Sequence, residues 1–243
     1  MILEAQTIID LGYILRHFEE PIFPRTYSTK TTENHQFIVY SMEEALARFK
    51  QADLLDCKIN AYPNRIEWKG LNRQSPDLIF IDLDLARFKS RLALDRALTR
   101  TLKKIKEKFN CDVQPTVLWS GNGYHIYLPV KAFVLEEESI FADFQTPSRK
   151  FIQFAEQFLS DNKADPCHSK GISFKNCMIR IPGSTNSKNG GEEVKIIQEW
   201  NGVRPAINWL LRDFRRYLIH DRFEVRPKIM EPVIFSTNWR TMK

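Results

Sequence analysis

The sequence predicts a single domain of the α+β class. Segments with helical periodicity alternate along the chain with short apolar runs of strand length, and no internal repeat or low-complexity block separates them. The 243 residues are 43% hydrophobic and 27% charged, which is enough apolar material for a full core. We expect an N-terminal α/β unit over about residues 1–76, a second unit over about 77–222, and a basic tail over 223–243.

Four segments are predicted helices because their apolar residues recur at the 3.6-residue period. The first begins after Ser41, where Glu44 completes the spacing of a capping box. The second spans residues 90–109, the third spans 146–161, and the fourth lies near 206–219. The apolar stripes of the last three are Leu94, Leu98, Leu102, Ile105 and Phe109; Phe151, Phe154, Ala155, Phe158 and Leu159; and Ile207, Leu211, Phe214 and Leu218.

Six short runs rich in apolar, β-branched and aromatic residues are predicted strands. They are residues 36–40, 57–62, 77–83, 116–120, 124–129 and 193–200. A Gly-Asn-Gly turn separates the fourth run from the fifth, which predicts a strand–turn–strand unit. Within the fifth run, His125 and Tyr127 share one face, and Tyr124, Ile126 and Leu128 share the other.

Two aspartates, Asp82 and Asp84, stand at the end of the third run, after four apolar residues. Side chains at i and i+2 of a strand share a face, so the two carboxylates would lie side by side and repel each other. Bound Mg²⁺ or Mn²⁺ would offset that repulsion through the hard carboxylate oxygens. The alternative is a solvated strand end whose acids cap the next helix, and the pair alone leaves both interpretations open.

The glycine turn before His125 has features of an anion site. Backbone N–H groups in such a turn can approach an anion, and a histidine beside them can donate a hydrogen bond to a phosphate. The alternative is a structural histidine with an ordinary hydrogen-bond partner. We single out His125 because the turn and the histidine occur together.

A second polar turn follows Arg180. Residues 182–186 have turn chemistry with hydroxyl and amide donors, and Lys188 comes directly after them. Such donors around one turn suit a triphosphate or a nucleic-acid backbone, whereas the alternative is an ordinary polar loop. Cys167, His168 and Cys177 provide three candidate zinc ligands with no clear fourth at a usual spacing, which argues against zinc there.

The composition narrows the class of protein. Lys and Arg number 36 against 30 Asp and Glu, and this basic excess is compatible with nucleic acid or nucleotides without requiring them. The four cysteines have no CxxC spacing, which predicts reduced thiols rather than a disulfide framework. No apolar run is long enough to cross a bilayer, and the first residues lack the pattern of a signal peptide. We expect a cytoplasmic protein with no membrane partner.

Taken together, the motifs resemble the archaeo-eukaryotic primase superfamily, in particular the compact primase-polymerases of archaeal and bacterial plasmids and viruses. The apolar run with DxD, the SGxGhH turn, the Asp-Pro at Asp165 and the RxPGSxNxK motif occur in the family's order. They extend over roughly residues 77–191, about half of the chain. Their joint occurrence is far more specific than any single motif.

The resemblance implies a role for each matching residue. Asp82 and Asp84 match the paired metal-binding carboxylates of the family, and Asp165 matches the carboxylate that completes the metal site. His125 matches the histidine that contacts the phosphates of the incoming nucleotide. The residues that would shape its turn are Ser120, Gly121 and Gly123. The positions of further nucleotide or template contacts are occupied by Arg180, Ser184, Asn186 and Lys188.

The implied fold is an RRM-like antiparallel sheet that carries the catalytic carboxylates, joined to an N-terminal α/β unit. The implied activity is template-directed nucleotidyl transfer on single-stranded DNA, as a primase, a DNA polymerase or both, with two divalent ions, Mg²⁺ or Mn²⁺. The implied partners are a template, a primer strand, dNTP or NTP, and a helicase in a longer protein or a separate chain. No cysteine lies between His125 and Asp165, so we expect no zinc-binding stem.

A rival from another class is a non-catalytic RRM-like module that binds single-stranded nucleic acid without a divalent metal. It would stack bases on aromatic side chains such as Trp119, Tyr124 and Tyr127. Other DxD enzymes fit less well: haloacid-dehalogenase-type phosphatases need Gly-Thr after the second aspartate, where this chain has Leu85 and Ala86. The motifs leave open whether chains are started without a primer and which sugar is preferred.

Overall fold

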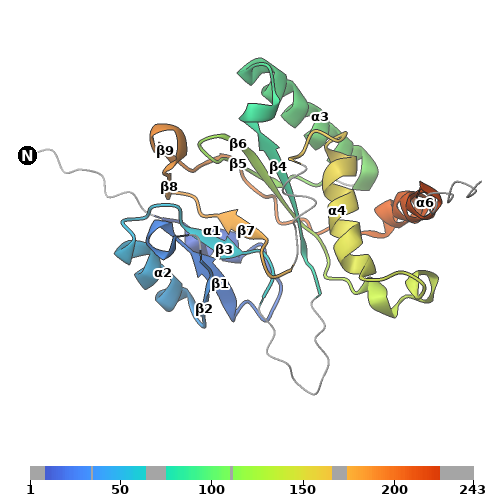
Figure 1. Cartoon of the computed structure of the whole chain (residues 1–243), viewed down its shortest axis with the longest axis horizontal. Coiled ribbons are helices and arrows are strands. Elements are labelled where there is room, and N and C mark those ends of the chain that lie inside the picture. The colour runs from blue at the N-terminus through green and yellow to red at the C-terminus, as the bar shows by residue number, and fades with distance from the viewer. Residues whose placement is uncertain (1–8, 34, 64–74, 110–111, 166–173, 225–243) are drawn as a thin grey trace, which may run out of the picture.

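The computed structural model describes residues 9–33, 35–63, 75–109, 112–165 and 174–224. Within these ranges the chain forms two four-stranded antiparallel sheets, a two-stranded hairpin and five α-helices (Figure 1). The predicted α+β class is therefore confirmed. No helix in the described ranges is both long and apolar enough to cross a membrane.

The first sheet contains strands from both ends of the chain. Its order is β2 (Phe37–Val39), β1 (Arg25–Ser28), β3 (Lys58–Asn60) and β7 (Met178–Arg180). Helices α1 (Leu11–Leu15) and α2 (Met42–Gln51) belong to the same part of the molecule, on the left of Figure 1. Strand β7 comes from the distant C-terminal half and becomes the edge strand beside β3. This edge faces the second sheet.

The second sheet carries the predicted carboxylates. Its order is β10 (Lys195–Gln198), β5 (Thr116–Trp119), β6 (Gly123–Pro129) and β4 (Leu78–Asp84). Helices α3 (Arg91–Phe109) and α4 (Pro147–Leu159) pack on β4, and α6 (Asn208–Glu224) packs against both helices (Figure 1). From β4 to α4 the chain runs strand, helix, strand, strand, helix, in agreement with the predicted RRM-like unit.

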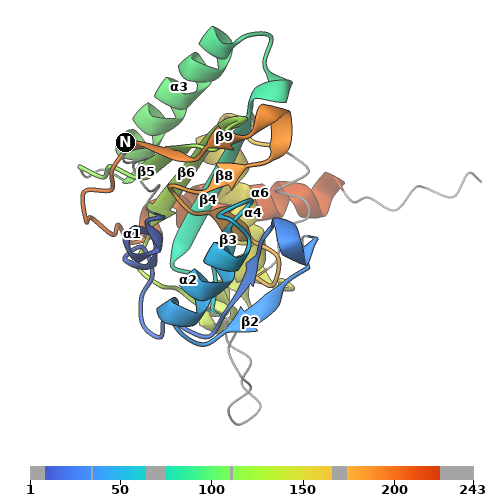
Figure 2. The same ribbon diagram turned by 90° about the vertical axis from the view of Figure 1, so that its left-hand side faces the viewer.

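Shorter elements connect the two sheets. The hairpin of β8 (Thr185–Asn186) and β9 (Glu192–Glu193) lies between them (Figure 2). Thr185 bridges to Leu55 in the segment before β3, and Glu192 accepts a hydrogen bond from Trp119 Nε1 of β5 at 2.6 Å. The 3₁₀ helices are η1 (Lys30–Thr32), η2 (Leu85–Arg87), η3 (Leu135–Glu137), η4 (Ser139–Phe141) and η5 (Lys188–Gly190). Buried hydrophobic side chains form one continuous cluster across both sheets, so they share a core.

The predicted helices and strands are confirmed, with ends displaced by a few residues. Ser41 caps α2, since its Oγ accepts a hydrogen bond from Glu44 N at 3.2 Å, whereas the Glu44 carboxylate accepts from Tyr40 N rather than from Ser41. The sequence periodicity does not predict strands β1 and β7. Every residue of β1 is buried, so it shows no alternation, and β7 is only 3 residues long. Residues 225–243 of the predicted tail lie outside the described residues.

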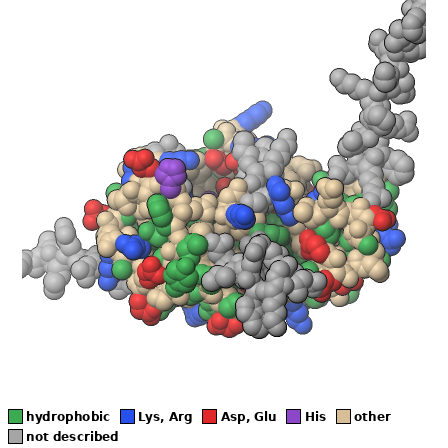
Figure 3. Space-filling view, turned by 60° about the horizontal axis from the view of Figure 1, so that its bottom comes forward, with side chains coloured by type: hydrophobic (Ala, Val, Ile, Leu, Met, Phe, Trp, Pro, Cys, Tyr) green, Lys and Arg blue, Asp and Glu red, His purple; other side chains and the backbone are tan. Residues whose placement is uncertain are grey.

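The face drawn in Figure 3 mixes side chains of both charges with hydrophobic ones. The net charge of +6 is therefore not gathered into a single patch on that face. Several large hydrophobic side chains are exposed around β2, including Phe37 and Tyr40. Surface charge alone identifies no partner, whereas a hollow between the sheets is lined by charged side chains of both signs.

Candidate active site

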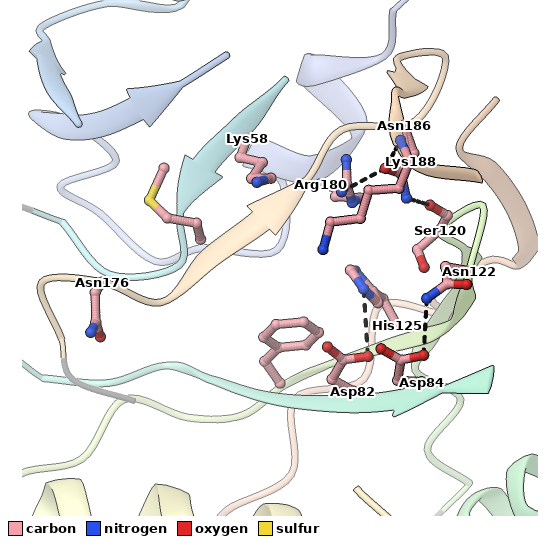
Figure 4. A pocket seen from close by; sticks show the side chains of 12 residues that line it. Lys58, Asp82, Asp84, Ser120, Asn122, His125, Asn176, Arg180, Asn186 and Lys188 are labelled. Carbon is pink, nitrogen blue, oxygen red and sulfur yellow. Dashed lines mark hydrogen bonds and ion pairs between the residues drawn. The ribbon is translucent and has the colours of Figure 1, made fainter. Parts of the chain in front are cut away.

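A cavity of about 200 Å³ lies between the two sheets (Figure 4). Strands β4 and β6 form one wall, and β3 and β7 form the opposite wall. The lining residues are Lys58, Phe80, Asp82, Asp84, Ser120, Asn122, His125, Asn176, Met178, Arg180, Asn186 and Lys188. Apart from Phe80 and Met178, every lining side chain is polar or charged, which suits a charged ligand better than an apolar one.

The register of β4 and β6 places the acidic pair and the histidine on one face. Asp82 lies opposite His125, and Asp84 lies opposite Gly123, in an antiparallel ladder of 7 residue pairs. His125 Nε2 lies 3.6 Å from Asp82 Oδ1, and the Phe80 ring contacts the imidazole edge to face, with centroids 5.0 Å apart. The two carboxylates therefore do lie side by side, as the alternation of side chains predicts (Figure 4).

The glycine turn holds Asp84 and brings the two strands close together. Asn122 Nδ2 donates a hydrogen bond to Asp84 Oδ1 at 2.9 Å, and Asn122 O accepts one from Leu85 N. A Cβ on Gly123 would lie 2.2 Å from the backbone oxygen of Leu83, so only glycine fits there. Gly121 has a φ of +85°, which also favours glycine.

The opposite wall is cationic. Lys58 and Arg180 are neighbours in the β3–β7 register, and Lys188 enters the cavity from η5 (Figure 4). The Arg180 guanidinium is fixed from two sides, because Nη1 donates to Asp56 Oδ1 at 3.1 Å and Nη2 donates to Asn186 Oδ1 at 3.0 Å. The cavity thus places positive side chains of the first sheet across from the carboxylates of the second.

Burial and neighbouring charges shift the pKa values of Lys58 in the cationic wall and of Asp56 behind it. Burial, and then the charges of Arg180 and Lys188, lower the pKa of Lys58 below its ordinary value, although the Asp56 charge acts in the opposite direction. Burial alone would raise the pKa of Asp56, but hydrogen bonds from Ser187 and Arg180 and the Arg180 charge lower it. Because a bound anion would favour the charged form of Lys58, this wall is suited to phosphate.

Most of the residues singled out from the sequence meet in this cavity. The residues that line it are Asp82, Asp84, Ser120, His125, Arg180, Asn186 and Lys188. Gly121 and Gly123 build the adjoining turn rather than the lining. Ser184 is fully buried, and its Oγ donates a hydrogen bond to Ile181 O at 2.6 Å, so its contact is with the backbone of its own turn.

Asp165 lies beside Asp82 through the backbone. Its N–H donates a hydrogen bond to Asp82 O at 2.9 Å, across the edge of β4 that faces away from β6. Its side chain does not line the cavity, and within the described part of the chain no three His, Cys, Asp or Glu side chains are grouped as a metal site. The third carboxylate of the metal site therefore stays a prediction.

Four polar lining or supporting residues were not singled out from the sequence: Lys58, Asn122, Asn176 and Asp56. Asn122 could have been identified, because it stands inside the predicted Gly-Asn-Gly turn. Lys58 lies on a predicted strand, but its partner in the site comes from a strand far away in the sequence. No local pattern links Asp56 to Arg180, which follows it by 124 residues.

Asp82 and Asp84 meet the chemical requirement for a divalent cation. Paired carboxylate oxygens are the hard ligands that Mg²⁺ and Mn²⁺ prefer, and both side chains face the cavity rather than the helices behind the sheet. The amide of Asn122 already orients one of them. None of the described residues that line the cavity is a cysteine. Cys167 and His168 lie outside the described residues.

Two of the three aromatic rings that the rival binding module would use are buried. Tyr127 is fully buried and Tyr124 is 6% exposed, so neither offers a ring face to a base. The ring of Trp119 is covered by the Arg91 guanidinium at 3.7 Å from its centroid. Tyr124 and Tyr127 therefore offer no stacking surface in this structure, and the non-catalytic module stays an untested alternative.

No family model and no curated protein sequence matches the chain. Two solved structures are similar to it. The catalytic domain of primase RepB′ in complex with initiator DNA has 14% sequence identity, with 84% of this chain and 90% of that chain covered and a TM-score of 0.47. The AEP domain of the primase-polymerase (PrimPol) of cyanophage S-2L has 12% identity, with 83% and 94% covered and a TM-score of 0.48.

Proposed function

We propose that the chain catalyses template-directed nucleotidyl transfer on DNA, as a primase or a DNA polymerase. One observation supports this most directly: a pair of carboxylates on β4 faces the cationic side chains of Lys58, Arg180 and Lys188 across one cavity. Nucleotide addition needs both kinds of wall, because the triphosphate is anionic and its divalent ions must be held by oxygen ligands.

The cationic wall would bind the triphosphate of the incoming nucleotide. Arg180 is held rigidly by Asp56 and Asn186, so its guanidinium loses little freedom when it binds a phosphate. Lys58 and Lys188 add charge from two other elements, and His125 presents Nε2 on the carboxylate side, where the ring donates when it is protonated on both nitrogens. These contacts would hold the α-phosphate in line with the attacking 3′ oxygen.

Asp82 and Asp84 would hold two divalent ions, Mg²⁺ or Mn²⁺, with Asp165 as the proposed third ligand. When bound, such ions lower the pKa of the attacking hydroxyl group and offset charge on the leaving pyrophosphate. Asn122 would keep Asp84 turned toward the cavity, and Phe80 would keep His125 in place beside Asp82. No protein nucleophile is required for this reaction.

The proposed substrates are single-stranded DNA template, a primer strand, and dNTP or NTP. A primer-extension assay with Mg²⁺ or Mn²⁺ tests the proposal in the unaltered chain and in the Asp82→Asn, Asp84→Asn double variant. The matched control replaces two exposed acids near the far end of α3, Glu107→Gln with Asp112→Asn. We expect extension by the parent and the control and none by the double variant.

Two outcomes would contradict the proposal. Extension by a correctly folded double variant at the parental rate would remove the carboxylates from the chemistry. Binding of single-stranded DNA by the parent, with no incorporation under either metal, would instead favour the non-catalytic module. A primer-free reaction in the same assay separates priming from extension.

A further inference from the structure

The hydroxyl group of Tyr127 bonds to both backbone polar groups of Arg180. Arg180 N donates to Tyr127 Oη at 2.9 Å, and Tyr127 Oη donates to Arg180 O at 3.2 Å. Tyr127 belongs to β6 of the second sheet, whereas Arg180 ends β7 of the first. One phenol therefore joins the two walls of the cavity.

The Tyr127 hydroxyl group makes the hydrogen bonds to Arg180 that a neighbouring strand would otherwise make. Strand β7 is an edge of the first sheet, so the N–H and C=O of Arg180 that point away from β3 have no neighbouring strand. Tyr127 is fully buried and Arg180 is 6% exposed, so water is a poor substitute partner for these groups. Buried backbone groups are costly when they lack a hydrogen bond, so the phenol fixes where β7 ends.

The same hydroxyl group reaches His125. His125 Nδ1 lies 3.3 Å from Tyr127 Oη on the same face of β6. A hydroxyl group has one proton, and here it is donated to Arg180 O, so toward the imidazole the oxygen can only accept. Nδ1 must then carry a hydrogen, and Nε2 is the ring atom that faces Asp82 and the cavity.

We propose that Tyr127 is a positioning residue that sets the orientation of His125 and Arg180 together, so that the histidine and the arginine contact one nucleotide triphosphate from opposite walls. This inference rests on the proposed function, because it assigns those two side chains to the same ligand. Tyr127 does not line the cavity and would not touch the substrate itself.

Two further observations support this role. Burial raises the pKa of the Tyr127 phenol, so the hydroxyl group keeps the proton that it donates to Arg180 O at all ordinary pH values. The Phe80 ring packs against both Tyr127 and His125, with centroids 5.3 Å and 5.0 Å away. The two side chains are thereby held in one arrangement rather than in several.

The variant Tyr127→Phe removes the hydroxyl group and keeps the ring. Its matched control is Tyr62→Phe, because Tyr62 is also buried and its hydroxyl group donates to a backbone oxygen, that of Leu78, at 2.9 Å without contacting a lining side chain of the cavity. We expect kcat/KM for the incoming nucleotide to fall at least ~10-fold in Tyr127→Phe and by less than ~2-fold in Tyr62→Phe. Affinity for the DNA template should be unchanged in both.

A spectroscopic measurement on the unaltered protein tests the inference even if Tyr127→Phe fails to fold. Nitrogen-15 NMR of labelled histidine, assigned through a His125→Gln variant, should show hydrogen on Nδ1 of His125. A neutral ring with hydrogen only on Nε2 would overturn the inference, as would equal kinetics in the two tyrosine variants.

A binding measurement separates failure of this inference from failure of the proposed function. If the parent incorporates no nucleotide, a fluorescent dNTP still reports binding to the cavity. Weaker binding of this probe to Tyr127→Phe than to Tyr62→Phe would then support the positioning role while the catalytic proposal falls. Equal binding to both variants would overturn the positioning role as well.

Discussion

Asp56 Oδ1 accepts a hydrogen bond from Arg180 Nη1 at 3.1 Å, although the two residues stand 124 positions apart. Asp56 is 8% exposed and precedes β3, and its carboxylate also accepts hydrogen bonds from the backbone and hydroxyl groups of Ser187. The carboxylate thereby connects β7 with the turn that leads to Lys188. One acid outside the cavity lining thus fixes both the Arg180 guanidinium and the backbone directly before Lys188.

Replacing Asp56 should weaken both folding and nucleotide binding. In Asp56→Asn the buried Arg180 loses its counter-charge and keeps only neutral amide acceptors, so we expect the free energy of unfolding to fall by about 3 kcal/mol. We expect KM for the nucleotide to rise about 10-fold, since the guanidinium is less well oriented. Urea unfolding and primer-extension kinetics measure the two effects.

The control for this change is Asp53→Asn, an exposed aspartate of the same loop that should alter neither quantity. The pKa of Asp56 is lowered in the folded protein, so its contribution to stability is present above the unfolded pKa of 3.8 and is lost as pH falls below it. An Asp56→Asn protein as stable as the parent at pH 7 would contradict the role of this ion pair.

Gly123 is predicted to tolerate no side chain. The Cβ of Gly123→Ala would meet the Leu83 oxygen at 2.2 Å, and both atoms belong to paired strands that cannot move independently. We expect a loss of about 2–3 kcal/mol in unfolding free energy, with β4 and β6 forced apart beside Asp84. Gly12→Ala in α1, where the nearest atom is 3.9 Å away, should change stability by less than about 1 kcal/mol. Equal melting temperatures for the two variants would show that the strands can adjust.

The carboxylate wall could be predicted from the sequence because its information is local. Alternation along β4 puts Asp82 and Asp84 on one face, and a tight turn brings His125 back opposite them. The motif order then linked this wall to Arg180 and Lys188. These features need only the period of a strand and the length of a turn.

The opposite wall depends on contacts that no local period encodes. Strand β7 has 3 residues and joins the first sheet from the far half of the chain, so its pairing with Lys58 follows from packing of the whole core. The same is true of Tyr127, whose hydroxyl group meets Arg180 across two sheets. A resemblance in motifs identifies candidate site residues, but it does not identify the side chains that hold those residues in position.

Divalent cations should stabilise the chain through Asp82 and Asp84. Two adjacent carboxylates repel each other without a cation, so the Asp82→Asn, Asp84→Asn double variant should match or exceed the stability of the metal-free parent. At Mg²⁺ concentrations of about 10–100 times Kd, the parent should gain about 1–3 kcal/mol and the variant nothing. Thermal unfolding with Mg²⁺ and with a chelator measures this. Equal stabilisation of both proteins would place the cation elsewhere.

His17 and Asp77 should make opposite contributions to the pH dependence of stability. Burial, followed by the charges of Arg204 and Arg16, lowers the pKa of His17 from 6.5 to about 4. Burial raises the pKa of Asp77 from 3.8 to about 6, against the effects of the Glu19 N–H and of Arg25. Each of these pKa shifts corresponds to about 3 kcal/mol in the free energy of unfolding, so the two contributions are of similar size.

The signs follow from proton uptake. Folded His17 binds fewer protons than the unfolded residue, so its contribution to stability is lost as pH falls from 6.5 to about 4. Folded Asp77 binds more protons, so its contribution is lost as pH rises from 3.8 to about 6. In the parent the two changes largely cancel between pH 4 and pH 6, because they run in opposite directions over the same interval.

Single variants should expose each contribution. In His17→Gln the free energy of unfolding should fall by up to about 3 kcal/mol as pH rises from 4 to 6, because Asp77 alone remains. In Asp77→Asn it should rise by a similar amount over the same interval, because His17 alone remains. Urea titrations at half-unit steps of pH measure both slopes, and the double variant should be as flat as the parent. Slopes of the same sign in the two single variants would contradict the prediction. They would show that the folded pKa values of His17 and Asp77 do not lie on opposite sides of their unfolded values.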